Sequence, residues 1–407
     1  MTIDELVRRT FRDWSDEAQV PADLASKSLG RRRRHRLRAF AVVAGATAAA
    51  VAAAFAVPAL VEGQQGGGDR AAVVVMTDPS PSTETVGDPD AILPKTLVAA
   101  GGTAVYSYFT WENVKTSNDR EVRKLTWHRY DKGEQAYKKT PWAWLDVAPG
   151  GEAVAVLEQL PARRVGVIAG PGAEVRWIDV EQPAGAVQWS PDAKKLLLTN
   201  YGGNPDESYP MVNNSQKMMP ATRTGYSIVD PDSGQVGFHP VEQDENNAFA
   251  TRLDFSWSAD GTLVWEHNST PPGTKKFYDL DGNPRPAPPE VAETYQQAGL
   301  SPGGRLIATD SPDRRSAVTG VKDVGTGKVT PLLPVDGYWI EQLAAWADDD
   351  RLIAWACEFK APDGCVGSEF RNRLVLVDLA GGKTVPLTGY RENSQKPGSW
   401  EPVFSRR

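Results

Sequence analysis

A strand–turn–strand motif recurs six times along the sequence, and it limits the folds open to the chain. Each copy has an apolar anchor, a small or polar residue, a Pro/Asp/Gly turn and then an alternating apolar run. Successive anchors are 49, 42, 68, 43 and 46 residues apart, and they are Val98, Val147, Trp189, Trp257, Leu300 and Trp346. A period of this length with strands in every unit is typical of propeller blades.

One copy, "WSPDAKKLLLTN" from Trp189, could be read as a nucleophilic Ser190 beside an acidic Asp192. The equivalent positions elsewhere hold Ala259 before Asp260, Pro302-Gly303, and Asp348-Asp349. A turn tolerates such drift, whereas catalysis does not, so the motif predicts a turn, a core anchor at Trp189 and a buried strand after it.

A second strand follows each motif and ends in an Asp/Gly hairpin turn, as in "YDLDGNP" at residues 278–284. A calcium loop would need further carboxylates at fixed positions and a closing Glu. These are absent, so we interpret this segment as a hairpin turn too.

The body is therefore expected to be all-β, a six-bladed β-propeller over residues 95–407. Seven blades are the alternative, because the 68-residue interval could contain one more. That interval includes the polar segment 201–222, which we interpret as a loop inserted between strands and as a candidate rim of a binding face. The last residues, "GSWEPVFSRR", are expected to form a strand that completes the first blade.

Residues 39–61 contain no charge and would span about 34 Å as a helix, enough to cross a bilayer. An arginine cluster, residues 31–38, precedes this segment and predicts a cytoplasmic N-terminus. We therefore expect a single-pass plasma-membrane protein whose propeller is extracytoplasmic. A cleaved signal peptide is the rival, since small residues near Ala56 and Ala59 would permit cleavage. Residues 62–94 are rich in Gly, Pro, Ser and Thr, which indicates a flexible linker.

The cytoplasmic segment, residues 1–38, is expected to contain a short amphipathic helix. Thr2 and Glu5 fit a capping box, and Leu6, Phe11 and Trp14 share one apolar face with their neighbours. Two partners stay open for residues 2–20: the inner leaflet of the membrane, or a groove on a cytosolic protein.

Charge and cysteine content limit the remaining partners. Residues 1–38 have a net charge of +4, so the rest of the chain contributes −11 to the total of −7. An acidic body without a basic stripe argues against a nucleic-acid partner. Cys357 and Cys365 are a candidate disulfide in an oxidising compartment and free thiols in a reducing one. Two cysteines make only half a zinc site, so no metal is expected.

The segments "WSPDAKKLLL" and "WSADGTLVW" resemble the repeats of TolB-like and WD-repeat-like β-propellers. The resemblance covers about three quarters of the chain and implies a fold more than a function. The full layout is similar to that of actinobacterial membrane proteins, some of which look like regulators paired with an extracytoplasmic-function sigma factor. No anti-sigma motif is recognisable in this chain.

The sequence offers no catalytic constellation. The four histidines, His35, His128, His239 and His267, are far apart, and no nucleophile elbow, His-Glu-x-x-His motif or phosphate loop is present. A sialidase-like Asp box is approached at Ser258–Trp265, but its Gly is one place early. We therefore expect a non-enzymatic binding or sensing module without a cofactor, whose partner is a protein or envelope ligand. The alternatives are an envelope scaffold and a secreted sialidase-like hydrolase.

Overall fold

The computed structural model describes a chain of β-strands. The described residues are 84–210, 219–241, 243, 252–268, 274–288, 296–310, 319–332, 334–360, 364–366 and 371–407. The chain divides into two units, Met1–Gly68 and Asp69–Arg407. The expected cytoplasmic helix, membrane span and most of the linker lie outside the described residues. Within those residues no helix occurs, and so none is long and apolar enough to cross a membrane.

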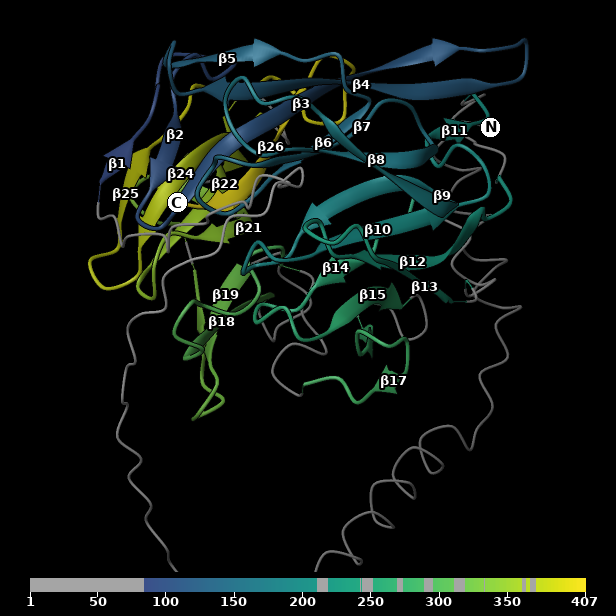
Figure 1. The fold of residues 1–407 in the computed structure, drawn as a ribbon. Coiled ribbons are helices and arrows are strands. Elements are labelled where there is room, and N and C mark those ends of the chain that lie inside the picture. The colour runs from purple at the N-terminus through teal and green to yellow at the C-terminus, as the bar shows by residue number, and fades with distance from the viewer. Residues whose placement is uncertain are drawn as a thin grey trace, which may run out of the picture. The chain divides into compact units, whose positions relative to one another are not determined.

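Five sheets make up the described part of residues 69–407 (Figure 1). The first sheet contains β1 (Thr85–Val86), β2 (Val98–Ala100), β3 (Thr103–Lys115), β4 (Glu121–Asp131), β5 (Ala136–Lys139), β11 (Glu207–Ser208) and β26 (Trp400–Arg406). The C-terminal strand β26 pairs with β3 from Thr103 to Thr110, so the end of the chain completes the first sheet as predicted.

The next two repeat units share one continuous sheet. Its strands are β6 (Trp144–Val147), β7 (Val154–Leu157), β8 (Ala162–Ile168), β9 (Arg176–Trp189), β10 (Leu196–Tyr201), β12 (Arg223–Val229) and β13 (Val236–Pro240). Strand β9 joins the two halves, because its first part pairs with β8 and its last part with β10. Ala184 takes part in both pairings.

Three smaller sheets contain the remaining repeat units. One is built from β14 (Ser256–Trp257), β15 (Val264–Asn268), β16 (Thr274–Tyr278) and β17 (Pro284–Arg285). Another has β18 (Leu306–Asp310), β19 (Thr319–Asp323) and β20 (Val329–Pro331). The last has β21 (Tyr338–Trp346), β22 (Arg351–Lys360), β23 (Gly364–Cys365), β24 (Arg373–Asp378) and β25 (Lys383–Pro386).

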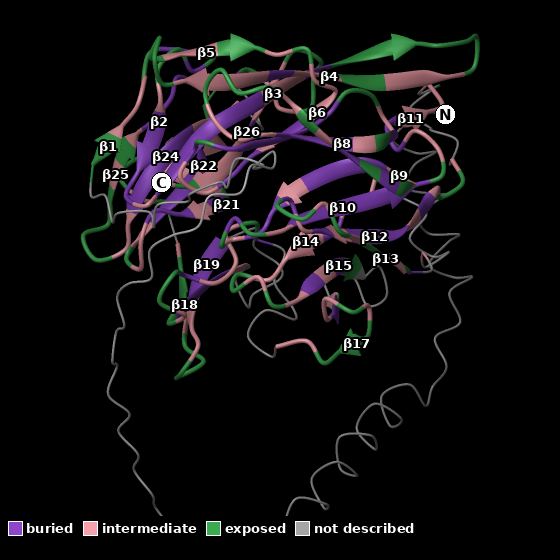
Figure 2. Ribbon diagram, in the orientation of Figure 1, coloured by how far each residue is buried: buried purple, intermediate pink, exposed green. Residues whose placement is uncertain are grey.

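Hydrophobic cores lie between neighbouring repeat units, and Figure 2 shows the buried strands that form them. Trp127 of the first sheet packs with Leu145 of the second unit, and Leu197 of the third unit packs with Phe255 before the fourth. The last sheet packs on the first, because Trp355 and Trp400 share a core. Shared cores therefore join the first four repeat units in sequence, the fifth to the sixth and the sixth to the first.

The Ser-Pro-Asp segment is a turn, as predicted. The Ser190 hydroxyl donates to Asp192 Oδ1 over 2.7 Å and accepts the amide of Lys195 over 2.9 Å. Ser258 repeats these contacts with Asp260 (2.6 Å) and the amide of Leu263 (2.9 Å). Each serine and its carboxylate therefore bind groups of their own turn.

The residue four positions after each anchor tryptophan, Ala193 or Gly261, adopts a left-handed backbone, which favours glycine. Gly261 has φ of +70° there, whereas Ala193 has +57°. We expect Ala193→Gly to raise the free energy of unfolding by about 1 kcal/mol, since it removes the cost of placing a Cβ in that region. Gly261→Ala, whose Cβ would also lie 3.1 Å from Pro191 Cδ, should lower it by at least as much. Urea unfolding measures both, and a loss of stability in Ala193→Gly would contradict the argument.

Candidate functional site

A cavity of about 1360 Å³ lies where the six repeat units meet, and it is the candidate site. Each unit contributes its innermost segment to the wall: β26, β6, the end of β9, β14, the loop at residues 296–302 and the end of β21. In the last five units these segments contain the anchors of the sequence repeat, whereas the first unit contributes β26 in place of its anchor Val98. The repeat that defines the fold therefore also builds the cavity wall.

Side chains tie these innermost segments to one another. The indole Nε1 of Trp144 donates to the carbonyl of Val187 over 3.1 Å. In the same way, Trp346 donates to the carbonyl of Gly299 over 2.9 Å, and the Thr103 hydroxyl donates to the carbonyl of Trp346 over 2.7 Å. Each bond joins one repeat unit to another, so the wall of the cavity is cross-linked.

Asp146 on β6 makes such a link with a carboxylate. Its Oδ2 accepts the amide N–H of Trp189 over 2.7 Å. Desolvation by the surrounding protein raises the pKa of Asp146 to about 7, although this hydrogen bond opposes the rise. The side chain is only half-buried because it meets the cavity, and water there weakens the desolvation. Asp146 thus titrates near neutral pH on the wall of the candidate site.

The cavity also has a cationic side, formed by two cross-strand neighbours. Lys275 on β16 lies opposite His267 on β15, and its Nζ is 4.2 Å from the centre of the Trp265 ring. Desolvation lowers the pKa of Lys275 to about 8, and desolvation together with Lys275 lowers the pKa of His267. No carboxylate in the described part of the chain forms an ion pair with Lys275. An anionic or aromatic group could therefore bind here by charge and by stacking.

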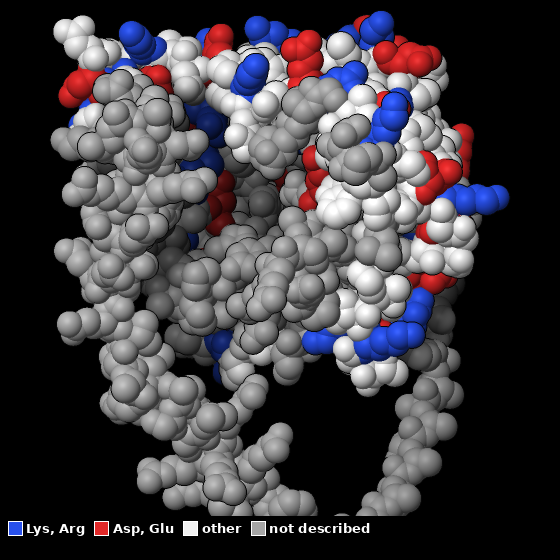
Figure 3. Space-filling model, turned by 180° about the vertical axis from the view of Figure 1, so that it is seen from behind, with Lys and Arg blue, Asp and Glu red and all other residues white. Residues whose placement is uncertain are grey.

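Three other acidic residues of the wall are bound by neighbouring groups. Asp348 binds the Arg351 guanidinium, Asp349 accepts the amide of Gly303, and Glu401 binds Arg391. Figure 3 shows the side of the molecule turned away in Figure 1, where acidic and basic side chains border a hollow. The free chemistry of the cavity therefore lies with Asp146, Lys275 and the aromatic rings.

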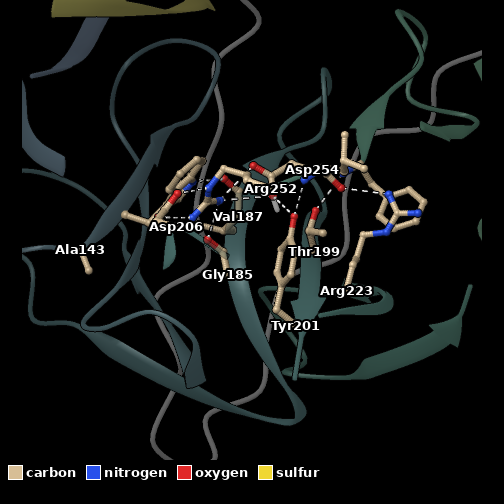
Figure 4. Close-up of polar contacts among 12 residues, drawn as sticks. Ala143, Gly185, Val187, Thr199, Tyr201, Asp206, Arg223, Arg252 and Asp254 are labelled. Atoms are coloured by element: carbon tan, nitrogen blue, oxygen red, sulfur yellow. Dashed lines mark hydrogen bonds and ion pairs between the residues drawn. The ribbon is translucent and has the colours of Figure 1, made fainter. Parts of the chain in front are cut away.

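A buried polar network fixes the segment that leads into β14 (Figure 4). Arg252 binds Asp206 over 2.6 Å and Asp254 over 3.0 Å, donates to the carbonyl of Gly185, and lies 4.4 Å from the Trp144 ring centre. The ion pairs raise the pKa of Arg252 against the desolvation that lowers it. Two carboxylates, a backbone carbonyl and an aromatic ring surround this guanidinium, which indicates a structural role.

The network continues through a second buried arginine. Arg223 forms an ion pair with Glu266 and donates to the carbonyl of Leu253 over 2.9 Å. The Tyr278 hydroxyl donates to Glu266 over 2.6 Å. Sequence reasoning missed these residues, because nothing in the local pattern pairs side chains that are 43 residues apart in the chain.

The insertion predicted at residues 201–222 contributes to this network. It begins where β10 ends, and its Asp206 binds Arg252. Glu207 and Ser208 form β11, which pairs with β4 of the first sheet. The described part of the insertion therefore crosses from the third repeat unit to the first.

The histidines and cysteines are not brought together. His128 stacks on Tyr108, His239 lies beside Tyr226, and His267 lies beside Trp265, each in a different sheet. Cys357 and Cys365 are joined by a disulfide, with 5.6 Å between their Cα atoms. Glu341 lies close to both sulfurs, but bonded sulfurs are not thiolate ligands for a metal.

The calcium-like segment is a hairpin turn, as predicted. Asp279 Oδ1 accepts the amides of Asn283 over 2.8 Å and Asp281 over 3.1 Å. These bonds, first the one from Asn283, lower the pKa of Asp279 to about 2. The carboxylate is thus consumed by its own turn and by Arg285.

Asp146→Asn tests the electrostatics of the cavity wall. The folded pKa of about 7 lies above the unfolded value near 3.9, so Asp146 costs stability increasingly from pH 4 to pH 7. We expect the substitution to raise the free energy of unfolding at pH 8 by about 1–2 kcal/mol, the full shift being reduced by cavity water. Near pH 4 the effect should vanish. Asp232→Asn, in an exposed turn, is the control, and equal effects of Asp146→Asn at both pH values would refute the argument.

Arg252→Met tests the buried network. It leaves Asp206 and Asp254 without their cation, so we expect a loss of about 3 kcal/mol in the free energy of unfolding. Arg305→Met breaks an exposed pair with Asp350 and should change stability by about 0.5 kcal/mol or less. Urea unfolding of both variants gives the comparison, and similar small losses would show that the network is not a major stabilising element.

Comparisons with known proteins find similar structures but no related sequence. No protein-family model matches it, and no curated protein matches its sequence. It is similar to the crystal structure of TolB from Acinetobacter baumannii at 14% identity, covering 75% of this chain and 66% of that one, with a TM-score of 0.40. It thus spans about two thirds of that protein's length.

Two further structures are similar over comparable lengths. A TolB from Agrobacterium tumefaciens is 13% identical, with 74% of this chain and 98% of that one covered and a TM-score of 0.38. Hydrazine synthase from Kuenenia stuttgartiensis is 15% identical, with coverages of 63% and 69% and a TM-score of 0.36. None of these likenesses assigns a role to a residue of this chain.

Proposed function

We propose that the chain is a membrane-anchored, extracytoplasmic binding or sensing protein that holds its ligand in the central cavity. One observation carries this proposal: six repeat units each contribute an innermost segment to a single cavity of about 1360 Å³. A concave site lined by aromatic rings and a few polar groups is typical of ligand binding, and this cavity is large enough for a small molecule.

The body is, on this proposal, a six-bladed propeller of TolB-like type. The second and third blades would share β9, and β26 would close the first blade. Shared cores join the first four units in sequence, the fifth to the sixth and the sixth to the first, which supports a ring of blades. The 68-residue interval is accounted for by the insertion that carries β11, which favours six blades over seven.

Binding is favoured over catalysis by the state of the polar groups. Ser190 and Ser258 are used by their turns, and the wall acids Asp348, Asp349 and Glu401 are held by neighbouring groups. What the wall leaves free is Asp146, Lys275 and the aromatic surface beside the lysine. No hydrogen bond or ion pair among the described residues joins Lys275 to Asp146, so the two are not arranged as a nucleophile and its base.

The membrane anchor is proposed from the uncharged segment 39–61 and the arginines before it. The Cys357–Cys365 disulfide is consistent with an oxidising, extracytoplasmic compartment. In a sensing role, residues 2–20 would transmit ligand occupancy to a cytosolic regulator such as a sigma factor. In a scaffold role, those residues would be dispensable.

Photo-crosslinking from the cavity wall tests the binding site. The full chain, expressed in its native host, contains a benzophenone amino acid at Gln188, or at exposed Thr330 on β20 as a control. We expect a discrete adduct from Gln188 alone, with at least a fivefold lower yield after Ser256→Trp fills the cavity. Equal adducts from both positions, or none from Gln188, would refute binding in the cavity.

A deletion of residues 2–20 separates sensing from scaffolding. If the protein signals, the deletion should abolish the transcriptional change that the full-length protein causes in its host, while crosslinking at Gln188 persists. Unchanged transcription in the deletion strain would favour the scaffold. Hydrolysis of a glycan or peptide by the purified full chain would instead favour the enzyme.

A further inference from the structure

The outer edge of β4 is open over a short stretch between two other strands. β5 pairs with β4 from His128 to Asp131, and β11 pairs with it at Glu121 and Val122 (Figure 1). One further backbone hydrogen bond continues each pairing. Next to β11, the Arg123 amide donates to the carbonyl of Asp206, and next to β5, the amide of Thr140 donates to the carbonyl of Trp127. Residues 124–126 lie in the gap.

The register of β4 shows which backbone groups face this gap. β3 and β4 pair without a bulge from Ser107 to Lys115, so hydrogen-bonding directions alternate regularly along β4. The bonds of Arg123 and Trp127 point to the outer edge, and Leu125 lies midway between them. The amide and carbonyl of Leu125 therefore also point outward, where no strand of the described chain pairs with them.

A pocket of about 420 Å³ occupies this gap. Its walls come from β4, from residues 139–143 after β5, from the turn at Glu158 and Leu160, and from Asn204 and Asp206 of the insertion. It is separate from the central cavity, since no residue lines both. The volume is suited to a ligand of two or three amino acids.

The charges around this pocket are unbalanced. Its two carboxylates are neutralised, because Glu158 binds Arg164 through both oxygens and Asp206 binds Arg252. Arg123, Lys124 and Lys139 also line it, and no ion pair joins any of them to a described carboxylate. Lys124 and Lys139 lie on one face of the sheet and Arg123 on the other, as strand alternation and the His128–Lys139 pairing require. The gap is thus flanked by cations on both faces.

We propose that this pocket binds a short acidic peptide in extended conformation, one residue of which exchanges two backbone hydrogen bonds with Leu125. Acidic side chains on either side of that residue would lie on one face of the sheet, where they would reach Lys124 and Lys139. Such strand addition combines backbone affinity with side-chain selection. The peptide would lie along the outer edge of β4, between β11 and β5, where no described strand pairs with β4.

Calorimetric titration of the full chain in detergent micelles tests the proposal. The probe is the tripeptide Glu-Ala-Glu, acetylated and amidated at its ends, and its comparators are the same peptide with an N-methylated Ala and the peptide Lys-Ala-Lys. We expect Glu-Ala-Glu to bind, N-methylation to weaken it about tenfold by removing one donor, and Lys-Ala-Lys not to bind. Binding that ignores N-methylation, or no binding of Glu-Ala-Glu, would overturn it.

Two exposed lysines provide matched variants. Lys139→Gln should weaken Glu-Ala-Glu about fivefold, whereas Lys383→Gln on β25, in another sheet, should leave it unchanged. Equal effects would show that the peptide responds to net charge alone, which overturns the site. If binding occurs only after deletion of residues 62–83, the chain's own linker occupies the pocket, and the proposal of a foreign peptide fails. None of these results depends on a ligand in the central cavity.

Discussion

The inner edge of each sheet imposes the constraint on which the rest of the structure depends. An innermost strand pairs on one side only, so its other edge presents amides and carbonyls that are costly to leave without partners. Here side chains from other repeat units supply several of those partners, namely the indoles of Trp144 and Trp346, the Thr103 hydroxyl and the Asp146 carboxylate. The same hydrogen bonds thus give the edge backbone groups their partners and join one sheet to another.

That arrangement also shapes what the cavity can do. Hydrogen bonds between repeat units occupy several polar groups of the wall, and Asp192 and Asp260 bind groups of their own turns. The groups left over are few and chemically distinct: a cation on an aromatic ring at Lys275, and a carboxylate at Asp146 whose pKa lies near neutrality. A wall of this kind suits recognition, and its charge would respond to mild changes of pH.

Much of the fold could be predicted because its signal is local. The turns at Ser190 and Ser258 are encoded within a few residues, and so were readable, as was the extra strand at the C-terminus. The docking of the insertion was not, since its position in the chain is visible but the pairing of β11 with β4 joins residues far apart. The same holds for Arg252, whose partners come from distant segments. The wall residue Asp146 precedes an anchor of the repeat, and reading that position in every unit would have found it.

Strand β9 has a consequence for how the molecule comes apart. Its fourteen residues belong to two repeat units, and the pairings change partner at Ala184 without a break in the chain. A repeat protein whose units meet only through side chains can lose one unit at a time. Here the second and third units share a backbone ladder, so amide protons in β7, β8, β10 and β12 should exchange with solvent through one common opening event. The smallest cooperative block in this region is two units, not one.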